Sequence, residues 1–289
     1  MSLTQNKLID TISELKQWMS NPSSKDDYTI YGKDKIEEKL KEDFLPKSTL
    51  NGFESLSRWY TNHFVYEMLT NYESTFRLDM TSNGYSILVL ANKLEEKYPK
   101  NPPYLLFDKA AFWLANSFIL DWKERSEELI KIINKNLFTG VLKGGLDFKP
   151  SSWFIIDIIN QVYEITIQKS ELNYPENMEV YQNAIDNWKT DDLNFIDSIV
   201  TSLCNFHLEN ATFGEDQENT ADIQFGNLAW FVYAFEILTL LKAREIKGIP
   251  NPEKFSHPLM QLSINKLPEN QISVINEDLF NKVLQKLND

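Results

Sequence analysis

Apolar residues recur at intervals of three and four along most of this chain. The clearest run consists of Phe53, Leu56, Tyr60, Phe64, Met68 and Tyr72. Residues at this spacing share one face of an α-helix, so the run predicts a long amphipathic helix over residues 53–76. No alternation of apolar and polar residues is long enough to predict a sheet. The sequence therefore predicts an all-α fold.

The same periodicity predicts a series of further helices. The expected spans are 3–19, 33–44, 82–98, 104–120, 122–137, 151–168, 176–188, 193–209, 222–247 and 277–287, with a short helix near 258–262. Ser151 is the expected N-cap of the 151–168 helix. Short connections favour antiparallel neighbours, and no repeat of fixed period is present. We therefore expect an irregular array of antiparallel helical hairpins.

A glycine-containing break interrupts the helical pattern near the middle of the chain. It includes Gly140, Gly144 and Gly145, and its spacing does not match a phosphate-binding loop. Such a break indicates a connector over residues 140–150. It would separate an N-terminal helical region, 1–139, from an acidic C-terminal region, 151–289, unless the two regions form one continuous domain.

Negative charge is concentrated in one part of the chain, between residues 171 and 222. The acidic residues there are Glu171, Glu176, Glu179, Asp186, Asp191, Asp192, Asp197, Glu209, Glu215, Asp216, Glu218 and Asp222. Lys189 is the one cation in this segment, which therefore supplies eleven of the thirteen net negative charges of the chain. Because like charges repel one another, this concentration indicates either a surface that meets a basic partner or a solvated face that maintains solubility.

Composition excludes several classes of protein. A sequence pI near 4.8 argues against a nucleic-acid partner, because binding to the phosphate backbone needs clustered cations. The N-terminal residues lack the apolar core of a signal peptide, and the most apolar window, 225–241, is too short and too polar for a membrane span. The single cysteine, Cys204, allows no intrachain disulfide. We therefore expect a cytoplasmic protein with no membrane partner.

Two short motifs invite a catalytic interpretation. The run Asp191-Asp192-Leu193-Asn194-Phe195 resembles the aspartate-rich Mg²⁺ motif of helical isoprenoid synthases, but Phe195 occupies a position that needs an acid. Asp191 is instead the expected cap of the helix that begins at Leu193. Cys204 and His207 share a helix face, as a nucleophile and its base could. A buried thiol beside a half-buried histidine explains that pair more simply.

A third motif, His63 with Glu67, has the spacing of two metal ligands on one helix. A third ligand would have to come from a distant part of the chain, so an ion pair on the helix surface is the simpler expectation. We therefore expect no catalytic residue, no metal site and no cofactor.

The C-terminal region resembles the ending of certain all-helical immunity proteins of bacterial polymorphic-toxin and type VI secretion systems. The residues that carry the resemblance are the helix Phe235-Glu-Ile-Leu-Thr-Leu-Leu-Lys-Ala-Arg-Glu-Ile-Lys, its stop Gly248-Ile249-Pro250, and Ser256-His-Pro-Leu-Met260. The resemblance covers about a tenth of the chain, residues 235–260 in its C-terminal part, and transfers no functional positions. It implies a non-enzymatic protein that binds a cognate toxin and blocks its active site.

A toxin that acts on nucleic acid has a basic groove, which a rigid acidic surface can occupy. Because loops on a rigid scaffold often carry recognition, the loop after residue 209 is the expected contact. Its acidic residues are Glu209, Glu215, Asp216, Glu218 and Asp222. The alternatives are a helical scaffold that binds some other protein and an enzyme with a helical fold, which would need acids converging from different helices in one deep pocket.

Overall fold

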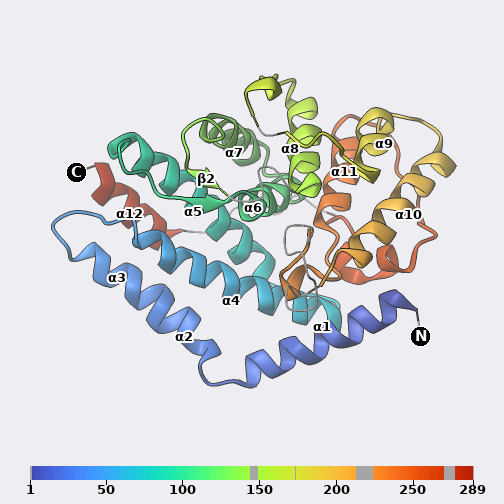
Figure 1. Cartoon of the computed structure of the whole chain (residues 1–289). Helices are drawn as coiled ribbons and strands as arrows, with labels where there is room; N and C mark the ends of the chain where they lie inside the picture. Colours follow the sequence, from blue (N-terminus) through green and yellow to red (C-terminus); the bar gives the residue numbers. More distant parts are fainter. Residues whose placement is uncertain (1, 144–148, 173, 213–223, 270–276, 289) are drawn as a thin grey trace.

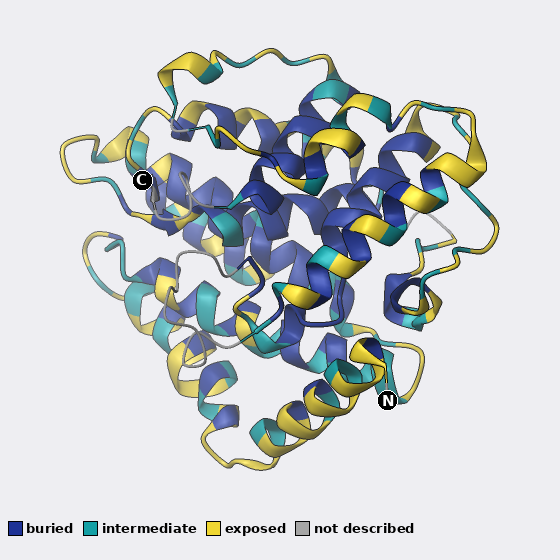
Figure 2. Cartoon of the chain, turned by 45° about the vertical axis from the view of Figure 1, so that its right-hand side comes forward, coloured by how far each residue is buried: buried dark blue, intermediate teal, exposed yellow. Residues whose placement is uncertain are grey.

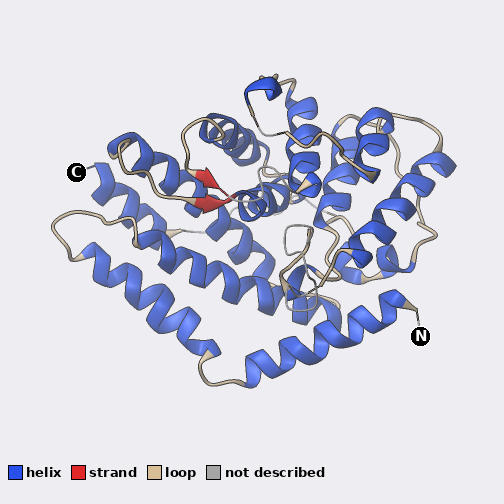
Figure 3. Cartoon of the chain, in the orientation of Figure 1, coloured by secondary structure: helices blue, strands red, loops and turns tan. Residues whose placement is uncertain are grey.

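The computed structural model describes residues 2–143, 149–172, 174–212, 224–269 and 277–288. Helices form almost all of its regular structure (Figure 3), which confirms the all-α prediction. The α-helices are α1 (Leu3–Ser20), α2 (Ser24–Tyr28), α3 (Lys35–Leu40), α4 (Thr49–Thr70), α5 (Phe76–Lys97), α6 (Phe107–Ile119), α7 (Lys123–Asn136), α8 (Pro150–Tyr163), α9 (Val180–Asn187), α10 (Leu193–Glu209), α11 (Phe235–Ile246) and α12 (Asp278–Asn288).

Shorter elements connect these helices. They are the π-helix η1 (Thr29–Asp34), the 3-10 turns η2 (Lys169–Glu171), η5 (Leu228–Trp230), η6 (Pro258–Gln261) and η7 (Ser263–Asn265), and the two-residue strands β1 (Leu105–Leu106) and β2 (Leu142–Lys143). The strands pair in parallel. Residues 142–143 of the expected connector therefore run beside the chain that leads into α6.

The middle of the molecule is occupied by α6, which is apolar on nearly every side. All of its residues from Ala110 to Ile119 are buried, and it packs against α5, α7, α8 and α11. A helix that is hydrophobic all round belongs in a core. Buried residues from before and after the connector belong to one hydrophobic cluster. Figure 2 shows that the buried residues lie mainly on the helices in the middle of the molecule, around α6 (labelled in Figure 1).

The helices expected over residues 53–76 and 82–98 are α4 and α5, but the boundary between them lies about six residues earlier than expected. The first helix does not reach residue 76. It ends at Thr70, and α5 begins at Phe76, within the expected span. Tyr72 adopts a left-handed backbone with φ of 63°, which a continuing helix does not allow. The Ser74 hydroxyl donates to Glu67 at 2.8 Å and accepts from the Phe76 N–H at 3.2 Å, so it closes the turn between α4 and α5.

The N-cap expected at Ser151 is wrong. Helix α8 begins one residue earlier, at Pro150, because proline suits the first helical position. The hydroxyl of Ser151 donates instead to Gln224 at 2.9 Å. The isoleucine-rich run that follows lies within α8, as expected, although α8 ends at Tyr163 rather than near 168.

The helix expected over residues 222–247 is limited to α11, residues 235–246. The apolar stretch before it turns because side chains bind its backbone. Asn227 accepts from the Ala229 N–H and starts η5, and the Asn265 amide bonds the Val232 carbonyl and the Ala234 N–H. Each bond replaces a helical hydrogen bond, so the chain reaches α11 as a buried, irregular segment.

Candidate functional site

The acidic part of the chain forms a hairpin of two helices, α9 and α10, at one edge of the molecule (Figure 1). Helix α10 has the bounds that its sequence predicts, Leu193–Glu209. Its cap is Asp192, not Asp191 as expected. The Asp192 carboxylate accepts from the backbone N–H groups of Asn194 at 2.9 Å and Phe195 at 3.1 Å, where the helix dipole also favours negative charge.

A buried arginine holds the turn of this hairpin. Arg244 of α11 is fully buried, and its Nη1 donates to the backbone carbonyls of Trp188 and of Thr190, the latter at 2.9 Å. Its Nη2 donates to the Pro250 carbonyl at 2.6 Å, and its Nε donates to Asn251 at 3.0 Å. Burial lowers the pKa of Arg244, and the charge of nearby Asp191 acts in the opposite direction. One guanidinium thus ties together the hairpin turn, α11 and the chain that follows it.

The hairpin exposes carboxylates and apolar side chains together. Among the described acidic residues of this segment, the exposed ones are Glu171, Glu176, Glu179, Asp186, Asp191, Asp192 and Glu209. Asp186, Asp191, Asp192 and Glu209 form no ion pair with a described lysine or arginine. Beside the two aspartates of the turn, Leu193 is 40 % exposed and Phe195 is 39 % exposed. The turn therefore presents unpaired negative charge next to apolar surface.

Of the five residues expected to bind a partner, one is described. Glu209 is exposed at the last position of α10. Glu215, Asp216, Glu218 and Asp222 lie outside the described residues, so their assignment stays a prediction.

Cys204 and His207 do not form a catalytic pair. His207 is fully buried, where a half-buried ring was expected, and both of its nitrogens are engaged. Nε2 donates to the Trp230 carbonyl at 2.9 Å, and Nδ1 lies 2.7 Å from Glu236 Oε1. The thiol of Cys204 is buried, and burial raises its pKa, which keeps it protonated. The expected burial of the Cys204 thiol is confirmed, whereas the expectation of a half-buried His207 is wrong.

His63 and Glu67 do not form the expected ion pair. The His63 ring instead packs on Trp59, with ring centroids 4.0 Å apart, and Glu67 accepts from Ser74. Burial lowers the pKa of His63, which favours the neutral ring. Within the described ranges, no three histidine, cysteine, aspartate or glutamate side chains gather as they would to hold a metal ion.

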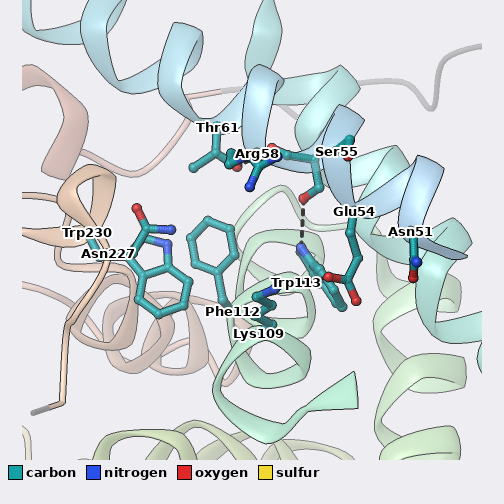
Figure 4. A pocket seen from close by; sticks show the side chains of 11 residues that line it. Asn51, Glu54, Ser55, Arg58, Thr61, Lys109, Phe112, Trp113, Asn227 and Trp230 are labelled. Carbon is teal, nitrogen blue, oxygen red and sulfur yellow. Dashed lines mark hydrogen bonds and ion pairs between the residues drawn. The ribbon is translucent and has the colours of Figure 1, made fainter. Parts of the chain in front are cut away.

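A second feature is a cleft of about 250 Å³ between α4, α6 and η5. Figure 4 shows how its walls are built: Arg58, Ser55 and Thr61 come from α4, and the Phe112 ring stands between the indoles of Trp113 and Trp230. The two indoles differ in their hydrogen bonds. Trp113 Nε1 donates to Ser57 Oγ at 2.9 Å, whereas the buried Nε1 of Trp230 has no acceptor among the described residues.

Two cations flank the cleft, and each is partly neutralised. Arg58 binds Asp27 through Nε at 2.9 Å and through Nη2 at 2.5 Å, while its Nη1 has no described acceptor. Lys109 Nζ donates to Glu54 at 3.0 Å. Each cation is therefore balanced by one carboxylate, and the other polar groups that line the cleft are amides and hydroxyls, which can both donate and accept.

Comparisons with protein-family models, with curated proteins and with solved structures each find no match to this chain. In the part of the chain that the structure describes, no helix is both long enough and apolar enough to cross a membrane.

The sequence did not indicate the roles of Arg244 and Trp230. Arg244 lies in a charged helix end, a pattern that usually indicates solvent exposure. The only available signal was its place three residues before Lys247-Gly248, where cations often bond terminal carbonyls. The cleft joins segments about fifty and more than one hundred residues apart, and no local pattern records that meeting.

Proposed function

We propose that this protein is a non-enzymatic binding protein that neutralises a basic protein toxin by covering its active site. The acidic hairpin α9–α10 would be the docking surface. The same proposal places the protein in the cytoplasm, bound to one protein partner and to neither nucleic acid nor membrane.

The observation that most supports this proposal is the composition of the hairpin turn. Asp191 and Asp192 stand unpaired next to the exposed side chains of Leu193 and Phe195. Charges of one sign steer an oppositely charged partner toward the surface, and apolar contacts then slow dissociation. Arg244 fixes the backbone of the turn through two carbonyls, so little ordering entropy remains to be lost on binding.

The segment that resembles immunity proteins also packs on this hairpin. Asp197 of α10 accepts from the backbone N–H of Ser256 at 2.9 Å and from its hydroxyl at 2.6 Å. The tail that follows the Gly248-Ile249-Pro250 stop is therefore hydrogen-bonded to α10. The segment that resembles immunity proteins thus contacts the helix that carries part of the acidic surface.

The test begins with affinity capture of the tagged protein from its native lysate at low and moderate salt. The expected result is one basic protein, retained less well at higher salt, that is toxic when expressed alone and harmless when co-expressed. A partner that is neither basic nor toxic would favour a helical scaffold, and the toxin proposal would then be rejected.

Charge reversal then tests the surface. The variant Asp186→Lys, Asp191→Lys, Glu209→Lys reverses three exposed charges and spares the Asp192 cap. The matched control, Glu14→Lys, Glu37→Lys, Asp43→Lys, makes the same change of net charge on α1, α3 and the segment after α3. We expect the first variant to associate at least tenfold more slowly and the control to remain close to wild type. Equal loss in both variants would show that net charge, and not the hairpin, is responsible.

A further inference from the structure

A pocket of about 230 Å³ lies beside α5 and is bounded also by η1, α4 and the start of α12. We call it the α5 pocket. Its lining is mostly apolar and comes from α4 and α12: Phe53, Leu56, Tyr60, Leu279 and Phe280. Sites for drug-sized molecules have volumes of roughly 300–1,000 Å³, so the α5 pocket suits a smaller ligand with an apolar part.

An acid without a partner lines this pocket. The Asp79 carboxylate is half-buried, and among the described residues it accepts no hydrogen bond and forms no ion pair. Burial raises the pKa of Asp79, which means that folding disfavours the charged form of this carboxyl. The fold thus retains a carboxylate that costs stability, as functional sites often do, and a cationic group of a ligand would offset that cost.

A second acceptor lies one helical turn further along α5. Asn83 is 7 % exposed; its Nδ2 donates to the Phe53 carbonyl, and its Oδ1 accepts from no described donor. Residues four apart share a helix face, so Asp79 and Asn83 belong to the same wall of the pocket. Protein atoms enclose Ser82 Oγ, but they do not enclose the Asp79 oxygens or Asn83 Oδ1, so a ligand can reach these acceptors. An ammonium group has three donors and can serve both.

A lysine without an ion pair supplies the opposite charge. Lys33 of η1 is exposed and lines the same pocket, and its Nζ lies 4.4 Å from the centre of the Tyr28 ring. Its charge opposes the rise in the pKa of Asp79, so the two groups lie near one another, yet no direct ion pair joins them. An acid and a base therefore line one small pocket without pairing with each other.

The other two acids of the pocket have their charges stabilised elsewhere. Glu277 accepts two hydrogen bonds from Arg125, at 2.7 and 2.9 Å. Asp278 is exposed in the first turn of α12, where water and the helix dipole favour its charge. Asp79 and Lys33 are thus the two charges that a ligand in the pocket can pair.

We propose that the α5 pocket binds a small apolar α-amino acid. Its ammonium donates to the Asp79 carboxylate and to Asn83 Oδ1, and its carboxylate accepts from Lys33 Nζ. Its side chain lies among the apolar residues of the lining. An α-amino acid carries both charges on one carbon atom, so it pairs two opposite charges at once, whereas Lys33 repels a simple amine. This site is independent of the acidic hairpin and of any toxin, so it stands or falls separately from the proposed function.

The test is an NMR titration of the ¹⁵N-labelled full chain with L-leucine and L-phenylalanine. Isoamylamine lacks the carboxylate of leucine and 4-methylpentanoate lacks its ammonium, so both serve as controls. We expect saturable shifts of the backbone amide signals from Asp79 to Ser86 with the amino acids. Isoamylamine should bind several-fold more weakly than leucine and 4-methylpentanoate about tenfold more weakly. No saturable shift with either amino acid at millimolar concentration would overturn the proposal, and a control that binds as tightly as leucine would overturn the assigned ligand class.

Two variants separate the two ends of the ligand. Asp79→Asn should weaken leucine and isoamylamine about tenfold and 4-methylpentanoate not at all, because it removes the charge that binds the ammonium. Lys33→Met should weaken leucine and 4-methylpentanoate up to about fivefold, the smaller effect of an exposed charge, and should not weaken isoamylamine. Asp10→Asn and Lys16→Met, the same substitutions at exposed positions of α1, should change none of these affinities. Asp79→Asn removes a charge that opposes folding, so the variant should fold, and unchanged leucine affinity in it would overturn the proposal.

Discussion

Replacing Arg244 by methionine tests whether one buried guanidinium holds the acidic hairpin in place. Methionine is unbranched and flexible and replaces the apolar stem of arginine, but it is shorter and has neither charge nor donors. The substitution removes hydrogen bonds to the carbonyls of Trp188, Thr190 and Pro250 and to the Asn251 side chain. It also removes a fully buried cation, whose desolvation already opposes folding.

The expected loss of stability follows from these two opposing effects. A hydrogen bond to a charged group contributes roughly 1.5–3 kcal/mol, and an acceptor left buried without a donor costs about 1–3 kcal/mol. The bond to Trp188 is fully buried, and water can replace the other three in part. After the recovered desolvation of the guanidinium is included, we expect a loss of about 3–5 kcal/mol. An unfolding entropy of roughly 2.1 cal/mol/K per residue converts this loss into a fall in Tm of about 5–8 °C for the 289 residues.

Thermal unfolding followed by circular dichroism measures this fall, and hydrogen exchange locates it. The backbone amides from Trp188 to Phe195 should lose protection before those of α6. Lys247→Met is the matched control, because Lys247 directly follows the same helix and, among the described residues, forms an ion pair only with exposed Glu164, at 3.4 Å. Its Tm should change by less than about 1 °C. An Arg244→Met protein as stable as this control would refute the reasoning that the guanidinium secures the turn.

Three further predictions concern buried titratable groups. Burial raises the pKa of Asp79 more than nearby Lys33 lowers it. The contribution of the Asp79 carboxyl to stability is therefore full below its unfolded pKa of about 3.9 and is lost as pH rises through its folded pKa. Asp79→Asn should raise Tm at pH 7 and leave Tm unchanged near pH 3. Burial raises the pKa of the Cys204 thiol, so a disulfide reagent at pH 8 should label the native protein at least 100-fold more slowly than the protein in urea. His207→Ala leaves the Glu236 carboxyl buried without its ring partner, so it should lower the free energy of unfolding in urea by about 3–5 kcal/mol. Adding Glu236→Leu to that variant should recover part of the loss. A His207→Ala protein as stable as wild type would show that the pair contributes little.

The sequence predicts helices best where a local signal marks both ends. Helix α10 has the expected bounds because an aspartate caps its start and polar residues follow its end. The boundary between α4 and α5 was predicted about six residues too late, because Phe76 continues the three- and four-residue spacing and the left-handed turn at Tyr72 gives no apolar signal. Helix α11 was predicted too long because an amide from residue 265 determines where it begins. Local patterns therefore predict the fold class, and distant side chains adjust the boundaries.

For the candidate sites too, the sequence shows the local features and not the contacts between distant residues. The acidic segment was evident from the sequence because charge is a property of composition, and its exposure follows from the cost of burying carboxylates. The hold on its turn was not evident, because three carbonyls and an amide meet at Arg244 only after α9, α10 and α11 have packed. Similarly, Trp113 and Trp230 both lie in apolar segments of the sequence. Only the folded structure shows that the Trp113 indole N–H has an acceptor, whereas that of Trp230 has none among the described residues.

The bonds that Arg244 makes to the turn offset the repulsion between the two unpaired aspartates. Asp191 and Asp192 are adjacent like charges at a turn, and their mutual repulsion favours opening it. Two cations lie near the turn. Lys189 is exposed and lies over the Trp188 ring, with its Nζ 5.0 Å from the ring centroid, whereas Arg244 is buried and bonds the backbone. Neither forms an ion pair with the two aspartates. The fold thus stabilises the turn from within and leaves its outward charges unpaired. A surface evolved for solubility alone gains nothing from rigid placement of its charges, whereas a surface that must match a basic partner gains both affinity and rate. The internal hold on the turn therefore supports the proposal that the hairpin recognises a basic partner.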